Sequence, residues 1–241
     1  MKMRDRWYSS RLESDVAVVR WGHFGRPVIV FPTAGGDAEE VERMLLIDAL
    51  GELIEAGRIK VYSCDSIAGY AMVRGDGDAR YRAALLNGFH EFVREEMIPA
   101  IWADCRTPGA DVVVSGASIG AFNAIAVLCR YPEVVSHAIA MSGTFDVASF
   151  IGPDAGEALY FATPLYFLPG LQGPALQRLQ HRFAVLASGE GRWENIENSW
   201  RLAEVMGQKG IPNRVDPWGP EYDHDWPTWR AMLPHYLSQM S

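Results

Sequence analysis

Long apolar runs are missing from this chain, and so is any excess of positive charge. No apolar stretch approaches the roughly 20 residues that a membrane-spanning helix needs, and residues 1–10 are polar, without the apolar centre of a signal peptide. Acidic residues outnumber basic ones by 30 to 22, which gives a formal net charge of −8. Surfaces that bind nucleic acid or anionic membranes need clustered basic residues. We therefore expect neither partner, and we expect a cytoplasmic protein.

Cysteine is scarce and metal-ligating clusters are lacking. Cys64, Cys105 and Cys129 are odd in number and widely spaced, which suits reduced thiols better than a disulfide framework. His90-Glu91 begins like a zinc-protease helix, but the fourth residue after His90 is Arg94, so that motif is rejected. We expect no bound metal.

The apolar residues that are present form an alternating pattern typical of a single α/β domain over residues 1–241. Strands are predicted at 26–31, 58–64, 111–114, 135–141, 182–188 and 212–217, and helices at 38–56, 78–103, 121–130, 195–209 and 226–238. Such alternation predicts a mostly parallel central sheet with helices on both faces. Residues 9–19 and 23–26 suggest an antiparallel lead-in at one edge.

The pattern fails between residues 150 and 173. Prolines at 153, 164 and 169 interrupt a run of aromatic residues there, among them Tyr160 and Phe161. We interpret this segment as a short Pro/aromatic-rich insertion. It either forms a cap over a functional site or packs on the surface without contacting substrate.

Residues 111–120, DVVVSGASIG, contain the strongest functional motif. A β-branched strand leads directly into Gly116-Ala-Ser118-Ile-Gly120, and an apolar helical segment follows. A sharp strand-turn-helix of this kind holds a serine hydroxyl exposed, next to a base and to oxyanion donors. The flanking glycines leave room for the tight turn. The motif predicts that Ser118 is a nucleophile.

A serine nucleophile needs a base, and His224 is the best placed of the six histidines. It follows the last predicted strand, in a loop that leads into the C-terminal helix. The carboxyl ends of parallel strands meet at one edge of the sheet, so this loop can approach the serine. We predict that His224 is the general base.

The acid that orients the histidine is expected between the serine and the histidine in the chain. Glu194, after the strand at 182–188, is the preferred candidate. Glu197 and Asp146 are alternatives, since Glu197 can instead favour the N-terminal dipole of the next helix. Asp216 and Asp223 stay open as further alternatives.

An oxyanion hole would complete the machinery. The first core strand ends in Pro32-Thr-Ala-Gly35-Gly36-Asp37, where small residues let backbone N–H groups approach a bound carbonyl. We predict the donors to be the amides of Gly35 and Ile119. The same residues are also explained by a Gly-Gly turn that Asp37 caps.

These motifs together resemble the α/β-hydrolase superfamily, near the esterases of the esterase D and mycobacterial antigen 85 type. The likeness rests on the elbow, the Pro-Thr-Ala-Gly-Gly segment, Ser142-Gly-Thr-Phe-Asp146 and His224-Asp-Trp, and spans about residues 15–240. It implies an α/β-hydrolase fold and carboxylic ester hydrolysis without a cofactor. Two departures stand out. Thr33-Ala34 replaces the usual His-Gly, and the usual Asp after the penultimate strand is missing, so Glu194 is assigned by analogy with members that use glutamate.

The resemblance implies a two-step acyl transfer on a small-molecule ester through a Ser-His-acid triad. Two alternatives stay open: an acyltransferase or thioesterase of the same fold, and a non-catalytic binding or scaffold protein. The acyl and alcohol pockets are formed by loops, so the sequence specifies neither the substrate groups nor the oligomeric state.

Overall fold

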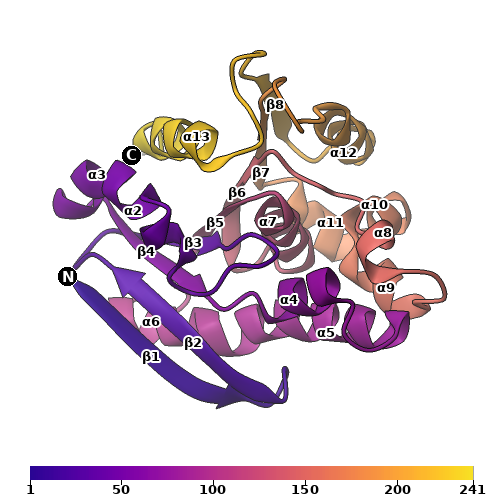
Figure 1. Cartoon of the computed structure of the whole chain (residues 1–241), viewed down its shortest axis with the longest axis horizontal. Coiled ribbons are helices and arrows are strands. Elements are labelled where there is room, and N and C mark those ends of the chain that lie inside the picture. The colour runs from indigo at the N-terminus through magenta and orange to yellow at the C-terminus, as the bar shows by residue number, and fades with distance from the viewer. Residues whose placement is uncertain (241) are drawn as a thin grey trace.

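The computed structural model describes residues 1–240, so residue 241 of the predicted domain lies outside the described part. Its centre is one eight-stranded sheet in the order β1-β2-β4-β3-β5-β6-β7-β8 (Figure 1). The strands are β1 (Lys2–Ser9), β2 (Ser14–Trp21), β3 (Arg26–Phe31), β4 (Ile59–Cys64), β5 (Val112–Ala117), β6 (Val135–Met141), β7 (Phe183–Ser188) and β8 (Asn213–Pro217). From β4 to β8 every neighbouring pair is parallel. The predicted mostly parallel sheet is therefore confirmed.

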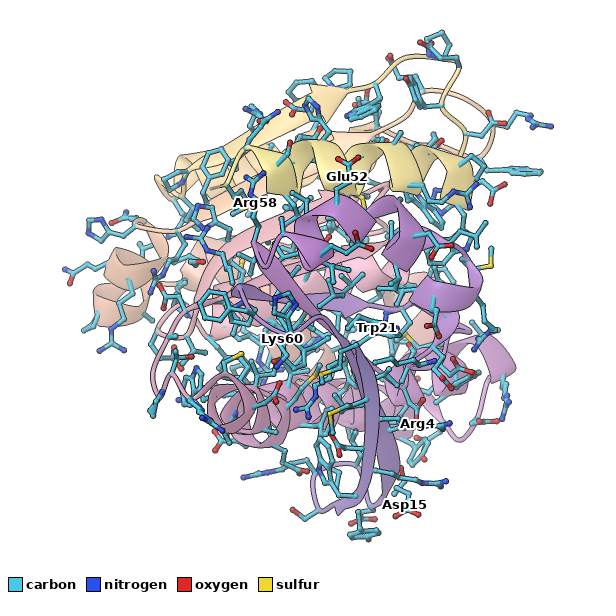
Figure 2. All side chains as sticks on the ribbon, turned by 90° about the vertical axis from the view of Figure 1, so that its left-hand side faces the viewer. Arg4, Asp15, Trp21, Glu52, Arg58 and Lys60 are labelled. Carbon is cyan, nitrogen blue, oxygen red and sulfur yellow. The ribbon has the colours of Figure 1, made fainter. Side chains whose placement is uncertain are left out.

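An antiparallel hairpin closes one edge of the sheet. β1 pairs with β2, and β2 pairs antiparallel with β4. The predicted lead-in is confirmed, but its bounds, 9–19 and 23–26, are wrong. β1 is an edge strand that is mostly exposed, so it lacks the apolar alternation by which strands are recognised. Charged side chains such as Arg4 and Asp15 lie along the hairpin (Figure 2). Such charges disfavour edge-to-edge pairing with another chain.

Helices cover both faces of the sheet, as predicted. One face packs against α1 (Glu40–Arg43), α2 (Leu46–Ala49), α3 (Gly51–Glu55) and α13 (Trp226–Ser238). The other packs against α4 (Ile67–Arg74), α5 (Ala79–Phe92), α6 (Ile98–Cys105), α7 (Ile119–Arg130) and α12 (Glu197–Gln208). Successive strand residues alternate between the two cores, as period-2 side chains must: Val113 lies in one, and Val112 and Val114 in the other.

One of the predicted helices is divided in the structure, and another is present with an irregular turn in its middle. The helix predicted over 38–56 is wrong as a single element, because Leu45 adopts a left-handed conformation (φ 60°) and separates α1 from α2. The long helix over 78–103 is confirmed from its Asp78 cap, whose carboxylate accepts from the Tyr81 amide at 2.8 Å. A π-helical turn, η1 (Val93–Met97), lies between α5 and α6.

α4 was not predicted. Its Gly69 weakens the helical pattern, yet a Cβ there would lie 2.6 Å from the Ala34 carbonyl oxygen. The glycine therefore lets α4 approach the loop after β3.

Residues 148–179 form a run of short helices beside α5 and α7 (Figure 1). They are α8 (Ala148–Ile151), α9 (Glu157–Ala162), α10 (Pro164–Phe167), the 3-10 turn η2 (Leu168–Gly170) and α11 (Gly173–Leu179). Pro164, Pro169 and Pro174 each lie in the first turn of one of them, where a missing N–H costs nothing. This explains why the sequence pattern there is irregular. Over residues 1–240, no helix is long and apolar enough to cross a membrane.

Candidate active site

Ser118 lies in a strained turn between β5 and α7. Its backbone has φ 57° and ψ −120°, a conformation that costs a non-glycine residue on the order of 1–3 kcal/mol. The Ser118 amide donates to the Met141 carbonyl at 3.0 Å, which ties the turn to the neighbouring strand β6. The surrounding sheet thus holds the serine at the carboxyl end of β5, as the elbow motif predicts.

Close backbone contacts explain both glycines of the elbow. A Cβ on Gly116 would lie 2.4 Å from the carbonyl carbon of Gly120, and one on Gly120 would lie 2.5 Å from the Phe31 carbonyl oxygen. α7 therefore starts directly over the ends of β5 and β3. Any larger residue at either position would push the turn out of place.

His224 contacts Glu194. The distance from His224 Nδ1 to Glu194 Oε2 is 3.4 Å, and the side chains are 24% and 1% exposed respectively. The rings of Trp229 and His224 pack nearly perpendicular to each other, with centroids 5.3 Å apart. Of the candidate acids named above, Glu194 is the one that the structure brings to the imidazole.

The Glu194 carboxylate is held by a chain of hydrogen bonds that leads back toward Ser118. Ser142 Oγ donates to Oε1 at 2.5 Å. The single hydroxyl hydrogen of Ser188 is shared between the Gly189 carbonyl at 2.9 Å and Oε2 at 3.3 Å. Trp229 Nε1 donates to Ser142 Oγ at 2.9 Å. Ser142 directly follows Met141, the residue that accepts from the Ser118 amide. The carboxylate and the serine are thus positioned by neighbouring strand ends.

Backbone contacts join the loop of Glu194 to the loop of His224. The His224 amide donates to the Arg192 carbonyl at 3.0 Å, and the Gly191 amide donates to the Tyr222 carbonyl at 3.0 Å. Arg192 also forms an ion pair with Asp223, with Nη2 2.6 Å from Oδ2. These contacts set the histidine and the glutamate at a defined separation, and they occupy Asp223.

The remaining candidate acids lie in other interactions. Asp146 accepts from Tyr166 at 2.8 Å and pairs with Arg201 at 3.2 Å. Partial burial raises the pKa of Asp146, but these contacts outweigh it and hold the pKa below its usual range. Asp216 pairs with Arg214 at 2.8 Å. Glu197 begins α12, the helix N-terminal role considered for it from the sequence.

The two predicted amide donors lie at turns. Ile119 is the first residue of α7, so its N–H has no intrahelical acceptor. Gly35 lies in the loop after β3, where an added Cβ would meet nothing within 4 Å. Asp37 does not cap α1, whose N-cap is Glu39; its carboxylate instead accepts from the Glu39 amide at 2.9 Å, within the turn before the helix.

Glu40 holds the loop of Gly35 and was missed from the sequence. Its Oε2 accepts from the Thr33 amide at 2.8 Å, and its Oε1 accepts from Thr33 Oγ1 at 2.7 Å. A Cβ on Gly36 would lie 2.1 Å from the Glu40 carboxylate. Burial raises the pKa of the Glu40 carboxyl, and this effect outweighs the hydrogen bonds from Thr33, which lower the pKa.

Ser142 and Trp229 were also missed as supports of Glu194. Ser142 did lie in a motif quoted from the sequence, but a serine and a tryptophan separated by 87 residues carry no spacing signal. Among residues 1–240 there is no group of three or more His, Cys, Asp or Glu side chains that could hold a metal ion.

The family model described as "Putative esterase" matches residues 77–240, which is more than half of the chain. The chain belongs to this esterase family. Family membership shows that the chain is a carboxylic ester hydrolase. Comparison with curated protein sequences found no match.

Solved structures of similar architecture include a ferulic acid esterase, with a TM-score of 0.77, 14% identity, and coverage of 100% of this chain and 98% of that one. The S-formylglutathione hydrolase of Staphylococcus aureus has a TM-score of 0.69 and 13% identity over 100% and 96% of the two chains. MPT51 of Mycobacterium tuberculosis has a TM-score of 0.70 and 14% identity over 98% and 97%. At such identities the likeness establishes the fold.

Proposed function

We propose that the chain hydrolyses carboxylic esters through an acyl-enzyme formed on Ser118, with His224 as general base and Glu194 as the orienting acid. The observation that carries this proposal is the contact between His224 and the buried Glu194, at the same sheet edge as the strained Ser118. Three strand spacings separate β5 from β8 in the sheet, about 14 Å. The loop from Pro217 to His224 is long enough to return the imidazole across that distance.

In the first half-reaction, His224 Nε2 accepts the Ser118 hydroxyl proton as Oγ attacks the ester carbonyl carbon. Nδ1 keeps its proton directed at Glu194, which fixes the tautomer and stabilises the imidazolium that forms. Collapse of the tetrahedral intermediate breaks the bond to the alcohol oxygen, which leaves with the proton from His224. Water then attacks the acyl-enzyme by the same route, releasing the carboxylic acid and restoring Ser118.

The oxyanion would be held by the amides of Gly35 and Ile119. The helix N-terminus at Ile119 adds a favourable dipole for the negative oxygen. Glu40 acts as a positioning residue, since its two contacts with Thr33 set the path of the chain that carries Gly35.

Reaction with a fluorophosphonate probe tests the nucleophile. The probe should label Ser118 in the intact protein, and Ser118→Ala should abolish both labelling and hydrolysis of p-nitrophenyl esters. Labelling that persists in the variant would overturn the assignment. A panel of p-nitrophenyl acyl chains of increasing length, with a thioester and an added alcohol acceptor, distinguishes an esterase from a thioesterase or acyltransferase. An inert protein on every substrate would favour the scaffold alternative.

The proposal extends to three further features. Residues 150–173 form a cap-like insertion within a single domain. The reason is that the short helices there follow the carboxyl end of β6, which lies at the same sheet edge as Ser118. The substrate is a small-molecule ester. The protein is cytoplasmic, which its three free cysteines favour.

A further inference from the structure

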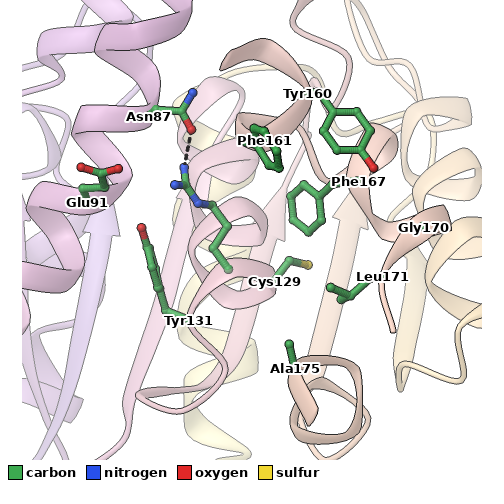
Figure 3. A pocket seen from close by; sticks show the side chains of 11 residues that line it. Asn87, Glu91, Cys129, Tyr131, Tyr160, Phe161, Phe167, Gly170, Leu171 and Ala175 are labelled. Atoms are coloured by element: carbon green, nitrogen blue, oxygen red, sulfur yellow. Dashed lines mark hydrogen bonds between the residues drawn. The ribbon is translucent and has the colours of Figure 1, made fainter. Parts of the chain in front are cut away.

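A pocket of about 560 Å³ lies far from Ser118, a volume in the usual range for small-molecule sites. It is formed by α5, by the last turn of α7 and by residues 160–175 (Figure 3). Ser118 precedes the first residue of α7, and Arg130 is its last. At 1.5 Å per helical residue the two lie about 18 Å apart. The pocket is therefore separate from the proposed catalytic site.

Four of the eleven residues that line the pocket are aromatic. Figure 3 shows Tyr160, Phe161 and Phe167 on the side of the short helices, with Tyr131 across from them. Tyr160 and Phe161 are 42% and 56% exposed. Adjacent large aromatic rings are usually buried, so their exposure beside a pocket marks a surface that can bind a ligand. Cys129 lies in the wall, and burial raises the pKa of its thiol, so it is uncharged. These surfaces suit a flat apolar ligand.

Arg130 supplies one positive charge in this apolar setting. Its Nη1 donates to Asn87 Oδ1 at 2.9 Å and to His90 Nδ1 at 3.0 Å. In the described chain, residues 1–240, no carboxylate lies within 4.0 Å of its guanidinium, and Nε and Nη2 make no hydrogen bond with protein. The unused N–H groups form the fork that pairs with a carboxylate in two parallel hydrogen bonds.

The partners of Arg130 hold it in place. Burial, followed by the charge of Arg130, lowers the pKa of His90 to about 3, so the ring is neutral. Because Nδ1 accepts from Arg130, Nε2 carries the proton and donates to Asn123 Oδ1 at 3.1 Å. Asn87 in turn donates to the Ala158 carbonyl of α9. The guanidinium is thus fixed between α5, α7 and the short helices before any ligand arrives.

One carboxylate in the lining opposes an anionic ligand. Glu91 lies on α5 (Figure 3), but it already pairs with Arg11 Nη1 at 3.1 Å. Its charge is therefore partly offset, and it weakens binding of an anion without preventing it.

We propose that this pocket binds a small organic carboxylate with an aromatic body, its carboxylate on the fork of Arg130 and its ring against Phe161, Phe167 and Tyr160. Charge complementarity selects the carboxylate, and the wall selects the aromatic body. The site is independent of catalysis at Ser118.

Isothermal titration calorimetry with benzoate, 3-phenylpropanoate and cinnamate tests the proposal. At least one should bind saturably, and its neutral amide should bind at least about tenfold more weakly, because a charged hydrogen-bonded pair is lost. Arg130→Gln should weaken the carboxylate by about the same factor. Glu91→Gln should strengthen it, because a like charge is removed. Equal affinities for the amide and the carboxylate would overturn the proposal. So would the absence of saturable binding of all three carboxylates up to about 10 mM.

Ala175→Trp serves as a second variant if Arg130→Gln does not fold. Ala175 lines the pocket and is exposed, so a large ring there fills the cavity without disturbing the core, and binding should be lost. Phe150→Ala removes an aromatic side chain of α8 outside the lining and should leave affinity unchanged, as should Ser118→Ala. Full affinity in Ala175→Trp, or loss in Ser118→Ala, would place the ligand elsewhere and refute the assignment.

Discussion

At the scale of single residues, the candidate active site depends on one buried carboxylate. The Glu194 side chain is 1% exposed, and burying a charge is costly unless hydrogen bonds compensate for it. Ser142, Ser188 and His224 supply those contacts. A buried glutamate with three polar partners is therefore better explained by a positioning role than by surface solvation.

We predict that Glu194→Gln lowers kcat by about 10⁴, because the imidazole loses both its tautomer and the support for its developing charge. The rate of p-nitrophenyl acetate hydrolysis measures this. Glu197→Gln and Asp146→Asn are matched controls and should stay within about tenfold of the parent enzyme, with folding checked by circular dichroism. A severe loss in Asp146→Asn together with an active Glu194→Gln would move the acid to the loop after β6.

Ser142→Ala should lower kcat by about 10- to 100-fold and leave KM nearly unchanged. The change removes a donor to Glu194 and the acceptor of the Trp229 indole N–H. The acid is therefore less well oriented, while Ser118 and His224 keep their own side chains. Steady-state kinetics separate the two constants. Ser136→Ala is the control, because Ser136 lies at the other end of β6, the strand that Ser142 follows, and donates to the Val112 carbonyl. A change confined to KM would mean that Ser142 contacts substrate instead.

At the scale of elements, strand ends and their loops set the site. Glycines permit the close contact between the Glu194 and His224 loops: a Cβ on Gly189 would lie 2.0 Å from the Tyr222 carbonyl oxygen, and one on Gly191 would lie 2.4 Å from Asp223 Oδ1. The geometry of the acid and base is therefore a property of two loops packed together.

Gly189→Ala should destabilise the protein by about 1–3 kcal/mol, as overpacking does, and should lower kcat by displacing the loop of His224. Gly207→Ala is the matched control. Gly207 lies in α12 with nothing within 4 Å of an added Cβ, so alanine there should stabilise by about 0.5–1 kcal/mol. Urea unfolding and ester hydrolysis, measured on both variants, check this. Equal behaviour of the two would show that the loop contact does not position the histidine.

At the scale of the whole molecule, the sheet separates two hydrophobic cores and gathers the functional loops at one edge. The turn that carries Ser118 and the loops of Glu194 and His224 follow β5, β7 and β8, which are all parallel. Further along α7 lie the buried contact between His90 and Asn123 and, at the opposite end of the helix, the half-buried Arg130. Because His90 is a titratable ring that is fully buried there, the free energy of unfolding should depend on pH through His90.

The folded-state pKa of His90, about 3, lies below its ordinary value of 6.5, so the unfolded chain binds a proton first as pH falls. Its contribution to stability is complete above pH 6.5 and is lost as pH falls toward 3. The free energy of unfolding should exceed that of His90→Gln at pH 7.5, and the gap should narrow by about 1–2 kcal/mol by pH 5. Urea denaturation at both pH values measures it, with the exposed His23→Gln as control. A gap that stays constant would contradict a neutral buried His90.

Local sequence patterns predicted an element correctly where the pattern of apolar residues matches the burial found in the structure. The apolar alternation placed β3 and β6 at their observed bounds, and the glycine spacing located the Ser118 turn. They failed where backbone conformation or surroundings decided the outcome. The left-handed Leu45 divided one predicted helix into pieces, and the exposed strand β1 has no apolar alternation to reveal it.

The sequence by itself determined the esterase class, the parallel sheet and the candidates Ser118, His224 and Glu194, because these depend on short-range motifs and on the periodicity of buried residues. Only the tertiary structure decided which carboxylate reaches His224, since Glu194, Glu197 and Asp146 have the same chemistry and differ in what surrounds them. It alone also revealed Glu40, Ser142 and Trp229 as supports, and Arg130 as the cation in the lining of the pocket at the far end of α7. Those contacts join residues far apart in the chain, whose distance in space is set by the packing of whole strands and helices.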